Sequence, residues 1–133
     1  MTQEDKELLM KDLCARLPYG VKVRIYNPYR GGEYEYEDVT VDNFNEIINT
    51  FDISCIEPYL FPMSSMTEEQ NDSWRDAWFP DLMSSTDINY PESEKYLALS
   101  HYKSMDWLYK HHFDVNGLIE KGLAIDATGL NIY

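Results

Sequence analysis

Two alternating segments joined by a turn-forming sequence restrict the fold of this chain more than any other feature. In the first, VKVRIYN (residues 21–27), apolar residues alternate with polar ones, as in a strand with one buried face. The second, EYEYEDVTV (residues 33–41), alternates in the same way. Between them, NPYRGG (residues 27–32) contains the residue types that form turns. The pattern predicts an antiparallel β-hairpin.

The second strand of this hairpin separates its acidic and aromatic residues onto opposite faces. One face carries Glu33, Glu35 and Glu37, and the other carries Tyr34 and Tyr36. Neighbouring carboxylates on the acidic face are spaced by two residues of strand, about 6.6 Å. This row is the first candidate interaction surface in the sequence.

The glutamate row has two interpretations. In the one we favour, it is a solvated face that pairs across the hairpin with the bases of the first strand, Lys22 and Arg24. In the other, it belongs to a negative surface that imitates nucleic acid, extended by Asp72 and Asp76 farther along the chain. The first predicts cross-strand ion pairs, and the second predicts one continuous acidic stripe.

The chain on either side of the hairpin is expected to supply helices and a further strand. Residues 3–17 have leucines at helical spacing, and Thr2 is well placed to cap the first turn. Residues 42–51 also have apolar residues at helical spacing, so we favour a short helix there, with a strand as the alternative. Residues 52–60 are typical of a strand, with Pro58 marking its exposed end.

The second half of the chain is expected to be mainly helical. Thr67 and Gln70 match a capping box, in which each side chain bonds the backbone N–H of the other residue. Ser65 and Glu68 fit the same pattern two residues earlier, so the exact first residue of the helix is left open. The helix that they begin is expected to stop before Pro80, because proline disfavours a helix interior. Residues 80–93 have the composition of a polar loop, and a helical stretch over about 94–102 follows.

The segment YKHHFD (residues 109–114) is expected to join two short helices. Ser104 is expected to cap the first helix, and cationic groups lie in its last turn, where exposed carbonyls favour them: Lys110, His111 and His112. Asp114 is placed to cap a second helix over 115–121, which Gly122 would end in the left-handed conformation. In this interpretation the segment is a structural joint.

The same segment has a chemical interpretation, as an unrecognised enzyme site built on His111, His112 and Asp114. Adjacent histidines diverge by about 100° around a helix, whereas paired ligands need a spacing of three or four residues. The sequence also lacks the known metal, nucleophile and phosphate-binding motifs, so we name no catalytic, cofactor or metal residue and expect no cofactor. The enzyme hypothesis predicts a concave pocket that holds these side chains with perturbed pKa values.

Composition limits the classes of partner and compartment. A net charge of −13 makes direct binding of nucleic acid through phosphates an unfavourable hypothesis. Apolar runs are too short to span a membrane, and the charged first residues do not resemble a signal peptide, so we expect a cytoplasmic protein. Cys14 and Cys55 are flanked by apolar residues, which predicts reduced, buried thiols.

These patterns together predict an α+β fold. Over residues 1–133 we expect a single domain, with a small antiparallel sheet in the N-terminal half. Helices from both the N-terminal and the C-terminal parts are expected to pack against it. The order of the strands is left open.

Three longer segments carry a family resemblance: KDLCARLPYGVKV (11–23), PYLFPMSSMTEEQ (58–70) and DWLYKHHFDVNGLIEKGLAIDA (106–127). The chain resembles a family of uncharacterised small proteins of gut Bacteroides-type bacteria and of their phages and mobile elements. The resemblance covers the two ends and the middle connector, and Phe61 stands where relatives often carry arginine. It implies a genetic context and no reaction.

From this context and the missing catalytic motifs, we expect a non-catalytic accessory protein of phage or mobile-element origin that binds a protein partner. Its many aromatic residues suit such an interface, since the chain has 11 Tyr and 3 Trp. The alternatives are an acidic nucleic-acid mimic that inhibits a DNA-binding protein, and the enzyme described above. An exposed aromatic patch would favour the interaction protein.

Overall fold

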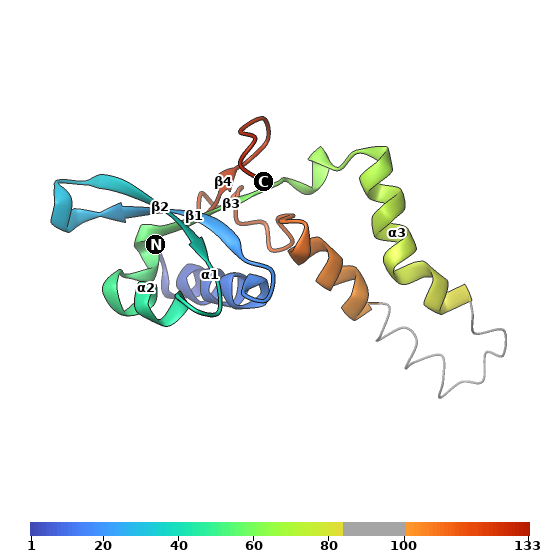
Figure 1. Cartoon of the computed structure of the whole chain (residues 1–133), viewed down its shortest axis with the longest axis horizontal. Helices are drawn as coiled ribbons and strands as arrows, with labels where there is room; N and C mark the ends of the chain where they lie inside the picture. The colour runs from blue at the N-terminus through green and yellow to red at the C-terminus, as the bar shows by residue number, and fades with distance from the viewer. Residues whose placement is uncertain (84–100) are drawn as a thin grey trace.

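The computed structural model describes residues 1–83 and 101–133, with side chains through residue 77 and from residue 101, and it confirms the α+β class. Its sheet has the order β2-β1-β3-β4 (Figure 1). The strands are β1 (Val21–Asn27), β2 (Glu33–Val39), β3 (Ile56–Leu60) and β4 (Ile125–Asp126). The hairpin and the β1–β3 pair are antiparallel, but β4 runs parallel to β3, so the sheet is mixed. The sequence did not predict this short fourth strand.

Helix α1 (Gln3–Arg16) covers one face of the sheet. The Thr2 hydroxyl accepts a hydrogen bond from the Asp5 N–H at 3.1 Å, which confirms Thr2 as the cap. Leu9 and Leu13 are buried against the inward-facing residues of β1, Val21, Val23 and Ile25. The alternation in β1 therefore points its apolar side chains at the helix, as expected for a strand with one buried face.

Helix α2 (Phe44–Thr50) confirms the helical interpretation of this segment. It adds Ile47 to the same core. Asn43 precedes it without capping it, because the Asn43 side chain is occupied elsewhere. The Asn43 amide accepts from the Thr40 N–H at 2.8 Å and donates to the Asp38 carbonyl at 2.7 Å, which ties the end of β2 to the start of α2.

Strand β3 is shorter than predicted, because a 3-10 turn over Ile53–Cys55 precedes it. The prediction that Pro58 marks its exposed end is wrong, since Pro58 is buried in the middle of β3 opposite Val23. The pairing with β4 begins only at Tyr59, so the missing N–H of the proline interrupts no bond to β4.

Helix α3 (Glu68–Met83) starts at the predicted capping box. Thr67 N–H donates to the Gln70 side chain at 2.9 Å, and Gln70 N–H donates to the Thr67 hydroxyl at 3.1 Å. The helix continues through Pro80, so the predicted stop is wrong. Proline removes one intrahelical bond and strains one turn, which weakens a helix without always ending it. The predicted loop beyond residue 83 and the helical stretch over 94–100 lie outside the described residues.

Residues 101–110 are helical, which corrects the prediction for Ser104. Ser104 does not cap this helix, because the residues before it already belong to the helix. It is instead a contact to α3: the Trp74 indole N–H donates to the Ser104 hydroxyl and carbonyl at 3.0 and 3.2 Å. Figure 1 shows α3 and this helix projecting together to one side of the sheet.

After the joint, the chain forms turns where a second helix was predicted over 115–121. Asp114 still accepts hydrogen bonds as a cap would, from the N–H groups of Leu118 and Ile119 at 2.8 and 2.9 Å. Gly122 has φ 72°, so its predicted left-handed conformation is confirmed. The Asp114 carboxylate thus organises a single turn that is too short to count as a helix.

Two further observations concern membrane-spanning helices and the cysteines. Across the described ranges, no helix has both the length and the apolar character needed to cross a membrane. Both cysteines are free, but the prediction that they are buried is wrong: Cys14 is exposed and Cys55 is half-buried. Cys14 lies on the outer side of α1, where its small apolar side chain needs no partner.

Candidate functional site

The face of the sheet opposite α1 carries aromatic and paired charged residues; we call it the open face. Directly opposed residues of antiparallel strands point to the same side, so the register assigns its members. They are Lys22, Arg24 and Tyr26 of β1, Tyr34, Tyr36 and Asp38 of β2, and Glu57 and Tyr59 of β3. Tyr26, Tyr34 and Tyr36 are 41%, 45% and 66% exposed. Large aromatic groups therefore face solvent side by side.

The charges on the open face neutralise one another. Lys22 pairs with Asp38 at 2.7 Å across the hairpin, and Arg24 pairs with Glu57 of β3 at 3.0 Å. The Arg24 guanidinium also lies 4.2 Å from the centre of the Tyr34 ring. A cation over a ring face is attracted to it, so Arg24 holds Tyr34 in place. The open face thus presents a nearly neutral, laterally supported aromatic surface in an otherwise acidic protein.

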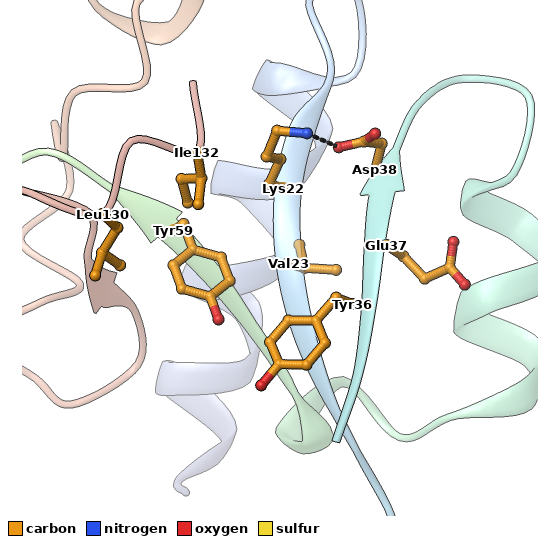
Figure 2. A pocket seen from close by; sticks show the side chains of 8 residues that line it. All are labelled: Lys22, Val23, Tyr36, Glu37, Asp38, Tyr59, Leu130 and Ile132. Atoms are coloured by element: carbon orange, nitrogen blue, oxygen red, sulfur yellow. Dashed lines mark hydrogen bonds and ion pairs between the residues drawn. The ribbon is translucent and has the colours of Figure 1, made fainter. Parts of the chain in front are cut away.

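A groove of about 440 Å³ lies on this face (Figure 2). Its apolar side chains come from the sheet and from the last residues of the chain: Tyr36, Tyr59, Leu130 and Ile132. Figure 2 shows the Lys22–Asp38 pair beside it. Burial raises the pKa of the Tyr59 hydroxyl, so this group is neutral at physiological pH. The groove therefore offers an apolar floor with a fixed ion pair at its border.

Tyr133 fastens the groove wall to the sheet. Its hydroxyl accepts from the Lys22 N–H at 2.9 Å and donates to the Tyr59 carbonyl at 2.8 Å, bridging β1 and β3. Its ring stacks on His112 with centroids 3.6 Å apart. Burial raises the pKa of Tyr133 to about 12. The segment bearing Leu130 and Ile132 is therefore held against the sheet by its last residue.

The glutamate row lies on the other side of β2. Glu33, Glu35 and Glu37 stand opposite Asn27, Ile25 and Val23, so the predicted pairing with Lys22 and Arg24 is wrong. The register places Asp38 and Tyr36 opposite those bases instead. Glu35 lies 3.6 Å from Arg30 of the hairpin turn. The row thus borders the side of the sheet that α2 covers, beyond the reach of the open-face bases.

Asp72 and Asp76 are exposed on α3 and do not join the glutamate row. Figure 1 shows β2 and α3 at opposite ends of the long axis of the molecule. The two acidic groups therefore form separate surfaces. A nucleic-acid mimic needs a continuous stripe, and this arrangement lends that hypothesis no support.

The segment YKHHFD ends the helix over 101–110 with a Schellman motif. Phe113 N–H donates to the Leu108 carbonyl at 2.9 Å, and His112 N–H donates to the Tyr109 carbonyl at 3.1 Å. His112 occupies the left-handed position of this motif with φ 66°, where glycine is usual. Phe113 and Leu108, the apolar pair that accompanies such ends, are both buried.

The side chains of this segment point to different partners. His111 packs on Trp107 at 4.1 Å between ring centroids, His112 stacks on Tyr133, and Asp114 binds backbone N–H groups. Burial lowers the pKa of His112 to about 4, with a smaller contribution from Arg16, and burial also lowers the pKa of His111. Both imidazoles are neutral at pH 7, and the three groups do not converge on one cavity as the enzyme hypothesis requires.

Comparisons with known proteins add no family: no family model matches the chain, and no similar curated protein or solved structure was found. Within the described residues, no group of three or more His, Cys, Asp or Glu side chains is arranged to hold a metal ion. The candidate interaction residues predicted from the sequence do not include the open face. The alternation of Tyr34 and Tyr36 indicates this face, but the same strand also carries the glutamates on which the prediction rests.

Proposed function

We propose that this chain is a small accessory protein that binds a protein partner through the open face of its sheet. The observation that carries the proposal is the exposed row of Tyr26, Tyr34 and Tyr36 beside an apolar groove. Tyrosine supplies large contact area with few rotatable bonds and keeps a hydroxyl for hydrogen bonding, so it is enriched in protein interfaces. Arg24, held by its ion pair with Glu57, lies over the Tyr34 ring and limits the motion of that ring further.

Its origin in a phage or mobile element, and its cytoplasmic location, belong to the same proposal. The origin is supported by the resemblance of residues 11–23, 58–70 and 106–127 to that family. The location is supported by the free thiols of Cys14 and Cys55, which are typical of a reducing compartment. A non-catalytic role is supported by the divergence of His111 and Asp114.

Site-specific crosslinking tests the proposed interface. A photo-reactive amino acid replaces Tyr36 in one variant and Tyr102 in a matched control, since both tyrosines are 66% exposed. Expressed in a Bacteroides-type host, the variant at position 36 should give a discrete crosslinked species of higher mass. The variant at position 102 should give none of the same mass.

A second variant asks whether that species depends on the aromatic surface. Replacing Tyr34 and Tyr26 by serine should abolish the crosslink from position 36, while replacing Tyr29, which is 83% exposed in the hairpin turn, should leave it intact. Equal crosslinking from positions 36 and 102, or a crosslink that survives loss of both tyrosines, would reject the open face as the interface.

A further inference from the structure

Strand β2 is an edge of the sheet. It pairs with β1 on one side, and in the described parts of the chain no strand pairs with its other side. All but one of its seven residues have exposed or half-buried side chains. An unpaired edge presents backbone N–H and C=O groups that a strand from another chain can bind.

The backbone direction shows which residues offer these groups. Successive residues of an antiparallel strand direct their backbone groups to opposite sides. The Asp38 carbonyl accepts from the Asn43 side chain, so it points away from β1. Tyr36 and Tyr34 share this direction because they precede Asp38 by two and four residues. The free edge therefore lies at Tyr34 and Tyr36, and Asn43 closes its end.

We infer that the edge of β2 binds an extended segment of the partner in which basic and apolar residues alternate. This inference rests on the proposed function and names the partner's chemistry. In an added strand, every second side chain would lie beside the glutamates of β2, and the side chains between them would lie beside Tyr34 and Tyr36. Lysine or arginine complements the glutamate row, and an apolar residue extends the aromatic face of Tyr34 and Tyr36 beyond β2.

The charge on both sides of the edge favours this occupant over a second copy of the chain. Glu35 and Glu37 share a cleft of about 330 Å³ with Glu46 of α2 and with Arg30, which pairs with Glu35. Three carboxylates against one cation leave the cleft acidic, so basic side chains are attracted there. Two β2 strands placed edge to edge would instead bring their glutamate rows together, and opposed like charges destabilise a strand pair. The net charge of −13 favours a basic partner over a second acidic chain at long range as well.

Synthetic peptides test the inference with purified components. The probe is a capped, fluorescent peptide of seven residues, the length of β2, that alternates lysine and valine. Its control has the same composition with the lysines and valines in two blocks. Fluorescence anisotropy at low salt should show the alternating peptide binding about tenfold more tightly, since only alternation satisfies both faces. Equal binding of the two peptides would reduce the interaction to net charge and overturn the inference.

Two pairs of variants locate the binding. The E35K/E37K variant should bind the alternating peptide about tenfold more weakly or worse, whereas D72K/D76K, which reverses the same number of charges on α3, should bind it less than about threefold more weakly. Tyr36→Pro removes an outward N–H that Tyr36→Val retains, so only the proline variant should abolish strand pairing. Circular dichroism verifies that each variant remains folded.

Equal binding by the proline and valine variants, or an equal loss in both charge-reversed variants, would overturn strand addition. Sedimentation of the protein without and with the alternating peptide tests the competing occupant. A dimer that the peptide fails to dissociate would assign the edge to a second copy of the chain and overturn the inference. A crosslink from position 36 that persists after these results would retain the open face as an interface without strand addition. The two proposals can therefore fail separately.

Discussion

The guanidinium of Arg16 donates two hydrogen bonds to the carboxylate of Asp12, at 2.8 and 3.0 Å, and both side chains are fully buried. Arg16 also donates to the Phe113 carbonyl at 2.6 Å and lies over the Tyr109 ring, while Asn116 donates to Asp12 at 2.9 Å. The last turn of α1 is thus tied to the joint at YKHHFD. A buried ion pair persists when such further bonds satisfy its remaining groups.

Breaking this pair from one side should destabilise the fold strongly. Asp12→Ala leaves the Arg16 charge buried without its carboxylate, so the free energy of unfolding should fall by about 3 kcal/mol or more in urea titrations. Asp38→Ala is the matched control, since the Lys22–Asp38 pair is largely exposed and its loss should cost less than about 1 kcal/mol. Similar losses in the two variants would mean that the buried network contributes little.

The left-handed residue of the Schellman motif gives a second prediction. His112→Ala removes the stack on Tyr133 and keeps a side chain at φ 66°, whereas His112→Gly removes the stack and the strain together. The glycine variant should therefore be more stable than the alanine variant by about 1 kcal/mol. Thermal and urea unfolding of the pair measure this difference, and a more stable alanine variant would contradict the backbone assignment.

The same histidine predicts how stability depends on pH. The pKa of His112 is about 4 in the folded protein, against an ordinary value of about 6.5, chiefly because burial penalises the charged ring. Between pH 4 and 6.5 the histidine is protonated in the unfolded chain but not in the folded protein. The contribution of His112 to the free energy of unfolding is therefore fully present above pH 6.5 and is lost as the pH falls towards 4. His112→Phe keeps an aromatic ring without titrating.

Urea unfolding of both proteins at several pH values checks this sign. The stability of the natural protein relative to His112→Phe should decline from pH 7 to pH 4 and then level off. An NMR titration should place the His112 pKa well below 6.5. A relative stability that rises as the pH falls would show that the folded state favours the charged ring.

Local features of the fold followed from the sequence because each depends on neighbouring residues. The hairpin required an alternating pattern on either side of a turn, and the Thr67–Gln70 box required a spacing of three residues. The left-handed Gly122 followed from the conformational freedom of glycine. Such signals need no knowledge of the tertiary structure.

Features that depend on contacts between distant parts of the chain could not be predicted from the sequence. The hairpin register, which sends the glutamates away from Lys22, depends on packing Val39 into the core beside Val21. The Asp12–Arg16 spacing is common on exposed helix faces, and the contacts with Phe113 and Asn116, which surround this pair, come from a distant part of the chain. The groove on the open face depends on the pairing of β3 with β1, because that pairing brings Tyr59 close to Tyr36 of the hairpin.

The bridge formed by Tyr133 gives the last prediction. Tyr133→Phe keeps the ring on His112 but removes the hydroxyl that links the Lys22 N–H to the Tyr59 carbonyl. Two backbone groups then lose their partner, so the free energy of unfolding should fall by about 1 kcal/mol. Hydrogen exchange at the Lys22 amide should accelerate. Tyr29→Phe, in the exposed hairpin turn, should change neither quantity. Unchanged exchange at Lys22 in Tyr133→Phe would show that the bridge does not hold the groove wall on the sheet.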